Sequence, residues 1–310
     1  MKVSPTLLVI LVALAVSAGT AAARDYPRPG PVTSVGTSEF AIAYAMEVPK
    51  GCHEVRVWHS NGRDRRVARH CFPATSTGSG ISAVAYSKGR ALYLAYAGGN
   101  IRDWMLYTKG ESAPRRIAFQ SRDVDAPPPI VVAQSSEWAL AYAVGSRIVA
   151  FDERGKRLFD YDAGAPVTAL STQQRGIAAV LESGRAIGLA YNGKLVAARD
   201  HAPGAAQTAE LTAQGLLIKT RTAVELRSPS VNRTFPVPAG ARWLGFASGR
   251  FAYVVGSSMY LGRVSDGKQA LYRRFAAPFV GQVGRITIAT ASGRTLSREN
   301  AVDAVARVFG

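Results

Sequence analysis

Two cysteines face each other across a predicted hairpin near the start of the chain. Cys52 and Cys71 flank the dipeptide Asn61-Gly62, and a two-residue type I′ turn there pairs residues whose numbers sum to 123. In this register the cysteines stand directly opposite each other at a hydrogen-bonded pair, where Cα atoms are about 5.5 Å apart. That spacing suits a disulfide. We therefore predict a Cys52–Cys71 bond.

Three histidines lie on the same hairpin. The register sets His53 opposite His70 and Trp58 opposite Arg65. Two facing imidazoles are ligands for Zn²⁺ or Cu²⁺, although His59 is too far along the strand to complete a site. The alternative is a pair of stacked or solvated surface histidines. His53 and His70 are therefore only a candidate metal site.

Recognisable catalytic motifs are absent from the sequence. It contains no phosphate-binding glycine loop, no zinc-protease helix motif and no nucleophile elbow. Its four histidines form no spaced triad with a serine. We expect no cofactor and no catalytic residues, and we regard a binding protein as a better explanation of the chain than an enzyme.

A repeated pattern of short strands must position these residues. Apolar runs begin at residues 39, 90, 137, 176, 215, 250 and 285, in steps of 51, 47, 39, 39, 35 and 35 residues. Repeats of roughly 40 residues built from short strands are typical of propeller blades. The pattern predicts an all-β protein, a seven-bladed β-propeller with four antiparallel strands in each blade.

Hairpin turns recur with the same period as the strands. Turn dipeptides that end in glycine follow most of the apolar runs, at Asn61-Gly62, Lys109-Gly110, Arg154-Gly155, Asn192-Gly193 and Asp266-Gly267. Glycine supplies the positive φ that a type I′ turn requires. The sixth unit is predicted to place strands at 242–246, 251–255, 259–264 and 269–275. No joint between units is long enough to separate domains, so we predict one domain over residues 24–310.

The sixth unit resembles a known kind of blade. The run Ser248-Gly249-Arg250-Phe251-Ala252-Tyr253-Val254, followed by 261–268, is similar to a blade of the bacterial propellers related to the Tol-system periplasmic propeller and to YVTN and WD repeats. The resemblance extends roughly over 32–299 and implies the propeller fold without a specific function. No Trp-Asp dipeptide is repeated here, so no subfamily is implied. Ring closure stays open: 301–309 could form a last strand or an amphipathic helix, or a segment near 31–36 could close the ring.

The four strands of a propeller blade are labelled a to d outward from the axis, and the loops between them alternate between the two faces of the ring. The loop in which a charged residue lies therefore predicts its face. The d–a and b–c loops share one face and carry an acidic set: Asp103, Asp123, Asp125, Asp160, Asp162, Asp200 and His201. These side chains could hold Ca²⁺ or a polar ligand, or could perform acid/base chemistry. Alternatively, they only stabilise the turns in which they lie. The a–b and c–d turns share the opposite face and carry a basic set: Arg63, Arg65, Arg66, Arg90, Lys156, Arg157, Arg175, Lys194, Arg250 and Arg285. These side chains could bind an anionic polymer, or they could simply be solvated.

The first 23 residues read as a secretory signal. Lys2 precedes an apolar run from Leu7 to Val16, and small residues precede a cleavage point after Ala23. An uncleaved membrane anchor is the alternative, although the run is barely long enough to span a bilayer. Export by this route predicts a secreted, extracellular or periplasmic protein and favours the disulfide.

Composition and net charge limit the classes of binding partner to be expected. Lys and Arg number 38 against 21 Asp and Glu, for a net charge of +17, and 47% of residues are hydrophobic. These values exclude a disordered or coiled-coil protein and favour anionic partners, unless the charge only maintains solubility. We expect a monomeric binding module for a protein or an anionic envelope polymer, without specific nucleic-acid binding. A hydrolase or lyase using the acidic set and a scaffold without a ligand are the alternatives.

Overall fold

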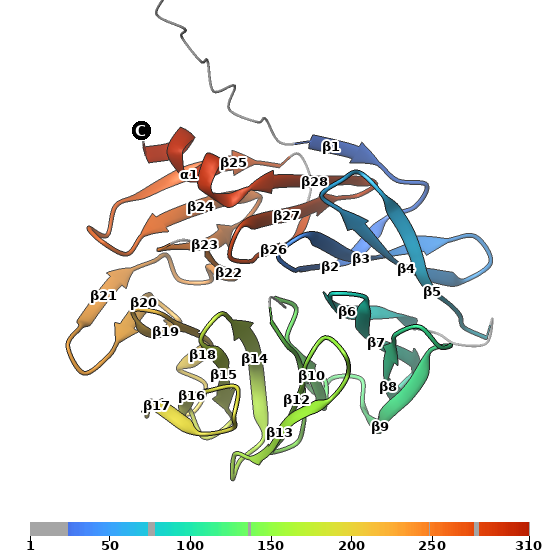
Figure 1. Ribbon diagram of the computed structural model, residues 1–310, viewed down its shortest axis with the longest axis horizontal. Coiled ribbons are helices and arrows are strands. Elements are labelled where there is room, and N and C mark those ends of the chain that lie inside the picture. The colour runs from blue at the N-terminus through green and yellow to red at the C-terminus, as the bar shows by residue number, and fades with distance from the viewer. Residues whose placement is uncertain (1–23, 74–77, 136–137, 248, 276–278, 310) are drawn as a thin grey trace, which may run out of the picture.

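The described residues of the computed structural model, 24–73, 78–135, 138–247, 249–275 and 279–309, form a ring of four-stranded antiparallel sheets around a central axis (Figure 1). Five sheets stand alone. The remaining eight strands are two blades joined by a single parallel pair, Gly245 with Val283. The predicted seven-bladed β-propeller is therefore confirmed.

Blades 1 to 4 follow the chain in order, each running from the innermost to the outermost strand. Blade 1 consists of β2 (Val32–Thr37), β3 (Ala41–Val48), β4 (Cys52–His59) and β5 (Asp64–Cys71). Blade 2 consists of β6 (Ser79–Ser87), β7 (Arg90–Gly98), β8 (Ile101–Lys109) and β9 (Arg115–Asp123). Blade 3 consists of β10 (Ile130–Val132), β11 (Leu140–Val144), β12 (Arg147–Phe151) and β13 (Arg157–Asp162). Blade 4 consists of β14 (Val167–Gln173), β15 (Gly176–Leu181), β16 (Ala186–Leu189) and β17 (Leu195–Arg199).

Blades 5 to 7 complete the ring. Blade 5 consists of β18 (Ala206–Thr212), β19 (Gly215–Thr220), β20 (Ala223–Arg227) and β21 (Asn232–Pro236). Blade 6 consists of β22 (Arg242–Ala247), β23 (Arg250–Val255), β24 (Ser258–Arg263) and β25 (Gln269–Arg274), within a residue or two of the predicted bounds. Blade 7 combines β26 (Phe279–Val283), β27 (Thr287–Ser292) and β28 (Thr295–Asn300) with β1 (Arg24–Pro27), and the helix α1 (Ala301–Phe309) follows.

The N-terminal strand closes the ring. β1 pairs antiparallel with β28, from Arg24 opposite Arg298 to Pro27 opposite Thr295, and so becomes the outermost strand of blade 7. Of the alternatives left open by the sequence, 31–36 belongs to the inner strand of blade 1 and 301–309 is helical. The Asn300 side chain accepts a hydrogen bond of 2.8 Å from the Val302 amide, which caps the helix. Among the described residues no helix has the length and apolar character needed to cross a bilayer.

The hydrophobic core is divided among the seams between blades. Seven clusters of buried side chains occupy the seven blade-to-blade contacts, and each draws residues from two neighbouring blades. Extra residues bulge from the inner strands of five blades, at Thr33, Ser82, Thr168, Gln207 and Leu244. A bulge increases local twist, which suits strands that must curve around an axis.

The cysteine hairpin forms as predicted, although its turn differs. Cys52 and Cys71 are disulfide-bonded and directly paired. The turn, however, has three residues between His59 and Arg63, and only Gly62 among them has a positive φ, of 86°. A bulge at Val67 in the outer strand then restores the predicted register at the cysteines. Between the bulge and the turn the prediction was wrong, because Trp58 lies opposite Asp64 and not Arg65.

The predicted two-residue type I′ turns are also wrong at three other glycines. Gly155 and Gly193 each close a three-residue turn, whereas Gly110 has no positive φ. A two-residue turn occurs where the glycine pattern fails, between Ser228 and Val231.

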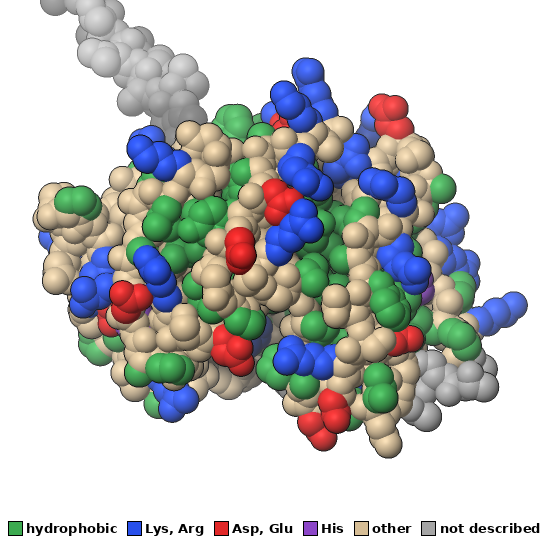
Figure 2. Space-filling model, turned by 90° about the horizontal axis from the view of Figure 1, so that it is seen from below, with side chains coloured by type: hydrophobic (Ala, Val, Ile, Leu, Met, Phe, Trp, Pro, Cys, Tyr) green, Lys and Arg blue, Asp and Glu red, His purple; other side chains and the backbone are tan. Residues whose placement is uncertain are grey.

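Cationic side chains predominate on the outside of the ring. Figure 2 views the edge of the ring from the side of blades 3 and 4, and Lys and Arg side chains are spread across it with fewer Asp and Glu between them. The charge excess of the sequence is therefore visible on the edge of the folded molecule.

Candidate ligand-binding site

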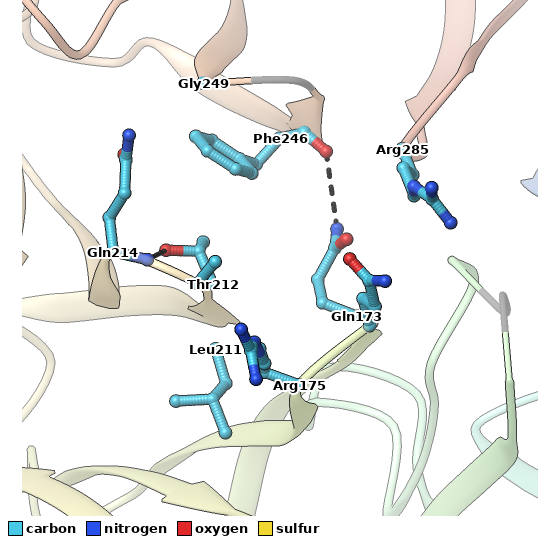
Figure 3. Close-up of a pocket in the computed structure, with 10 residues that line it drawn as sticks. Gln173, Arg175, Leu211, Thr212, Gln214, Phe246, Gly249 and Arg285 are labelled. Carbon is cyan, nitrogen blue, oxygen red and sulfur yellow. Dashed lines mark hydrogen bonds between the residues drawn. The ribbon is translucent and has the colours of Figure 1, made fainter.

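A pocket of about 190 Å³ opens on the face that carries the a–b turns. Its lining comes from the turns of four consecutive blades, 4 to 7, and Figure 3 shows these turns arranged around it: Gln173, Gln174 and Arg175; Leu211, Thr212, Ala213 and Gln214; Phe246 and Gly249; and Arg285. Because an a–b turn joins the two innermost strands of a blade, the pocket lies close to the central axis.

Tight turns project the polar side chains of this site. In blade 5 the Thr212 hydroxyl accepts a hydrogen bond of 3.2 Å from the Gln214 amide and donates one of 2.9 Å to the Gly215 carbonyl. Gly215 has a φ of +137°, and a Cβ there would lie 2.4 Å from the Arg227 carbonyl oxygen. Glycine is thus required after the turn. The turn leaves Gln214 exposed at the rim of the pocket.

A buried carboxylate lies beside the pocket and contacts one of its lining residues, Gln173. Glu210 is 1% exposed and accepts hydrogen bonds from Gln173 Nε2 at 2.5 Å and from Trp243 Nε1 at 2.7 Å. A second cavity of about 180 Å³ near the axis is lined by Glu210 and Trp243 together with Ser171 and Gln282. The hydrogen bond to Glu210 holds Gln173, which lines the pocket, in place.

Hydrogen-bond donors predominate at the rim. Arg175 is exposed, and Arg285 is half-buried with its guanidinium 3.9 Å from the carboxylate of Glu39. Guanidinium groups offer several N–H donors in a fixed fork, which suits carboxylate and phosphate groups. Phe246 adds an apolar wall. The pocket is therefore chemically complementary to an anionic group attached to an apolar or flat neighbour.

The predicted basic residues fall into two kinds. Arg63, Arg65, Lys156, Arg175 and Lys194 are exposed. Several others are engaged within the protein: Arg66 with Glu54, Arg90 with the Arg154 carbonyl oxygen, Arg157 with Asp160 and Arg285 with Glu39. Arg250 is half-buried. Only Arg175 and Arg285 of the predicted set line this pocket.

The predicted acidic set does not converge on one point. Asp160 forms ion pairs with Arg147 and Arg157, and the hydrogen bond from Arg147 holds the pKa of Asp160 below its usual value. The other members make local contacts or bridge neighbouring blades: Asp162 with the Gly164 amide, Asp123 with the Asp125 amide, Asp103 with Ser121, Asp200 with Arg185 and His201, after blade 4, with Glu225 of blade 5. Within the described residues no three His, Cys, Asp or Glu side chains gather in a way that could hold a metal ion.

The paired histidines form an aromatic contact. His53 and His70 are directly opposed, and both pack against Phe72 with ring centroids 5.6 and 4.6 Å away. His70 also contacts Tyr107 of blade 2 at 5.2 Å. Burial lowers the pKa of both imidazoles. These ring contacts are T-shaped or tilted and are made to Phe72 and Tyr107, and His53 is buried, so the two imidazoles are not a stacked surface pair. The candidate metal site at His53 and His70 stays a prediction.

Sequence reasoning missed most residues of the pocket and of the buried network beside it. Gln173, Glu210 and Trp243 were not singled out, although Glu210 stands in an otherwise uncharged inner strand. A carboxylate at an inner-strand position is costly to bury without partners, so it was a usable signal. The amides that line the rim carry no such signal, because glutamine is common in surface turns.

Comparison with known proteins supports the fold alone. No family model and no curated protein matches this chain in sequence. Similar solved structures include the WD40 β-propeller domain of Doa1 (TM-score 0.55, 10% identity, 90% of this chain and 97% of that chain). They also include a chain of the mitotic checkpoint complex (TM-score 0.58, 11% identity, 89% and 94%). A third is Raptor from Chaetomium thermophilum (TM-score 0.53, 15% identity), where the match covers 89% of this chain but 30% of that chain. At these identities the likeness shows the β-propeller fold alone.

Proposed function

We propose that this protein is a secreted, non-enzymatic binding module of the cell envelope or extracellular space, of the kind found among the bacterial secreted propellers that its sixth blade resembles. Its partner is a protein or an anionic polymer, and the a–b turn face binds it. The propeller fold suits this role, because a rigid ring presents several loops to one partner.

The observation that carries this proposal is the composition of the pocket at the a–b turns. Arg175 and Arg285 lie at its rim, whereas the buried carboxylate of Glu210 is already engaged by Gln173 and Trp243. An acidic side chain, a chain terminus or a polymer carboxylate or phosphate complements this arrangement.

Secretion rests on the N-terminal sequence alone, because residues 1–23 lie outside the part of the chain that the structure describes. Cleavage after Ala23 would leave the residues Arg24–Pro27 of β1 in place to pair with β28. The disulfide favours an oxidising compartment. Expression of the full chain in a bacterium, followed by N-terminal sequencing of the exported protein, should give Arg24 as the first residue. Retention in the cytoplasm with residues 1–23 intact would contradict secretion.

Binding is tested with two defined probes, a poly-glutamate peptide and a poly(glycerol phosphate) oligomer. Affinity for at least one should fall steeply between about 50 mM and about 300 mM salt, because each ion pair formed releases counterions. The double variant Arg175→Gln/Arg285→Gln should lower that affinity by about tenfold. The matched control, Arg122→Gln/Arg199→Gln, removes two exposed cations from the outer ends of blades 2 and 4 and should leave it within about twofold. Binding that is absent, insensitive to salt or equally reduced in both variants would contradict the proposal.

A further inference from the structure

The seam between blades 2 and 3 opens into a separate pocket of about 300 Å³ that is lined by four arginines. Arg90, Arg115 and Arg116 come from blade 2, and Arg157 comes from blade 3. Thr108, Ile117, Tyr142, Phe151 and Gly155 complete the lining, which contains no carboxylate. We call this cavity the arginine pocket. It shares no residue with the pocket at the a–b turns.

Arg90 is built into the seam by two glycines. A Cβ at Gly155 would lie 2.5 Å from the guanidinium carbon of Arg90, and a Cβ at Gly110 would lie 3.1 Å from one of its terminal nitrogens. The absence of side chains at these c–d turn positions lets the guanidinium reach from blade 2 to the Arg154 carbonyl oxygen of blade 3, at 3.0 Å. Its Nε is buried and has no hydrogen-bond partner within the described chain. The arginine is therefore held in place with an unused donor.

The other three guanidiniums are poorly neutralised. Arg115 and Arg116 are adjacent on the exposed outer strand β9, and Arg116 lies over the ring of Phe119 at 5.2 Å. Arg157 donates to Asp160 at 3.0 Å, but Asp160 also pairs with Arg147. Asp160, which is shared with Arg147, thus offsets part of the charge of the four cations that line the pocket. Like charges that line one pocket repel one another, and a bound anion would relieve that repulsion.

We propose that the arginine pocket binds phosphoryl oxyanions, and in particular two or three linked phosphate groups. Guanidinium forks match phosphate oxygens bidentately. A volume of 300 Å³ is roughly ten times the space of one water molecule in the liquid, about 30 Å³, so it exceeds what a single phosphate fills. The site goes beyond the function proposed above, because it lies on a different seam and uses different residues.

Two probes of the same chemistry separate the sources of such phosphates. Tripolyphosphate represents a free polyphosphate, and a poly(glycerol phosphate) oligomer represents a phosphodiester polymer. Isothermal titration of the full mature protein with each probe should show saturable binding of at least one, and the probe that binds more tightly identifies the source. Arg115→Gln/Arg116→Gln should weaken that binding by about tenfold or more. These side chains are exposed, so their substitution should preserve the fold, which circular dichroism checks.

Matched controls make the result decisive. Arg122→Gln removes a cation from the far end of the same strand and should bind either probe within about twofold of the parent. Arg175→Gln/Arg285→Gln removes the cations of the a–b pocket and should bind tripolyphosphate within about twofold of the parent, whereas its affinity for poly(glycerol phosphate) also reports on the a–b pocket. If neither probe binds, or if Arg115→Gln/Arg116→Gln binds as the parent does, the inference is overturned. An equal loss of affinity in Arg122→Gln would show that the probe is held by non-specific charge attraction, and this result would also overturn the inference. Loss only in Arg175→Gln/Arg285→Gln would overturn it while supporting the function proposed for the other pocket.

Discussion

Two seams of the ring use arginine in opposite ways. At the seam between blades 7 and 1, Arg28 follows the closing strand and is 7% exposed, with its guanidinium 2.5 Å from the carboxylate of Asp64. The same guanidinium lies over the rings of Tyr26, Tyr44 and Trp58 at 4.9 to 5.4 Å. At the seam between blades 2 and 3, four arginines line a cavity without any carboxylate in its wall.

Hydrophobic packing alone does not separate the two seams, since each has its own cluster of buried apolar side chains. They differ in charge balance and in empty space. The seam between blades 2 and 3 carries the arginine pocket. A groove of about 880 Å³ also opens there and extends to blade 4, lined by prolines, by apolar side chains and by polar ones that include Arg122 and Glu182. The buried ion pair of Arg28 with Asp64 stabilises the closed ring, whereas arginines beside a cavity whose charge is only partly offset are available to a ligand. Each prediction below tests that division.

The largest effect is expected at the closing seam. Arg28→Ala removes a buried cation that pairs with Asp64 and contacts three aromatic rings, and it should cost about 4 kcal/mol of unfolding free energy. Urea unfolding followed by circular dichroism measures the change. Arg24→Ala is the matched control, because Arg24 lies in the same closing strand with its side chain exposed, and it should cost less than about 0.5 kcal/mol. Equal losses in both variants would show that Arg28 has no special role in closure.

Removal of the disulfide should have the next largest effect. Cys52→Ser/Cys71→Ser opens a loop with a sequence separation of 19 residues, and the expected loss is about 3 kcal/mol. The ring should stay closed, because the bond lies within blade 1 and does not cross a seam. Thermal unfolding of the parent protein with and without a reductant gives an independent measurement. Loss of native circular dichroism at room temperature would mean that closure depends on this bond.

Acid should weaken a third seam, between blades 1 and 2, where His70 contacts Tyr107. Burial holds the pKa of His53 and His70 below the ordinary value of 6.5. As the pH falls through that value, the unfolded chain binds protons that the folded chain does not, so stability decreases. Urea midpoints at pH values from about 7.5 to about 5.5 should therefore fall. His53→Phe/His70→Phe should flatten this dependence; an unchanged slope would assign it to other groups.

The smallest effect on stability is expected at the arginine pocket. Arg115→Gln/Arg116→Gln changes two exposed side chains, so the unfolding free energy should change by less than about 0.5 kcal/mol in the absence of ligand. Tripolyphosphate should raise the melting temperature of the parent protein and not that of the variant, because a ligand stabilises the state that binds it. A loss above about 1 kcal/mol would make these arginines structural and remove the contrast between the two seams.

In the cysteine hairpin the predicted disulfide is correct, although the turn from which it was predicted is not. The sequence indicated a two-residue turn at Asn61-Gly62, whereas the turn has three residues and the outer strand contains a bulge. The two departures cancel at Cys52 and Cys71 but not at Trp58. A bulge depends on how a strand twists against its neighbours, and no local pattern near Val67 signals it.

By itself the sequence determined the all-β class, the seven repeats and the pairing of the two cysteines. These follow from local regularities, since alternating apolar runs and glycine turns act over a few residues. The strands of blade 6 match to within a residue or two for the same reason.

Only the tertiary structure decided how the ring closes and where its cations meet. β1 and β28 pair across more than 250 residues of sequence. A four-residue strand such as Arg24–Pro27 has too few apolar residues for its partner strand to be predicted from the sequence. The arginine pocket likewise joins Arg90, Arg115 and Arg157 from two blades. Such contacts depend on the angle and spacing between sheets, which are set by packing around the whole axis and not by any single repeat.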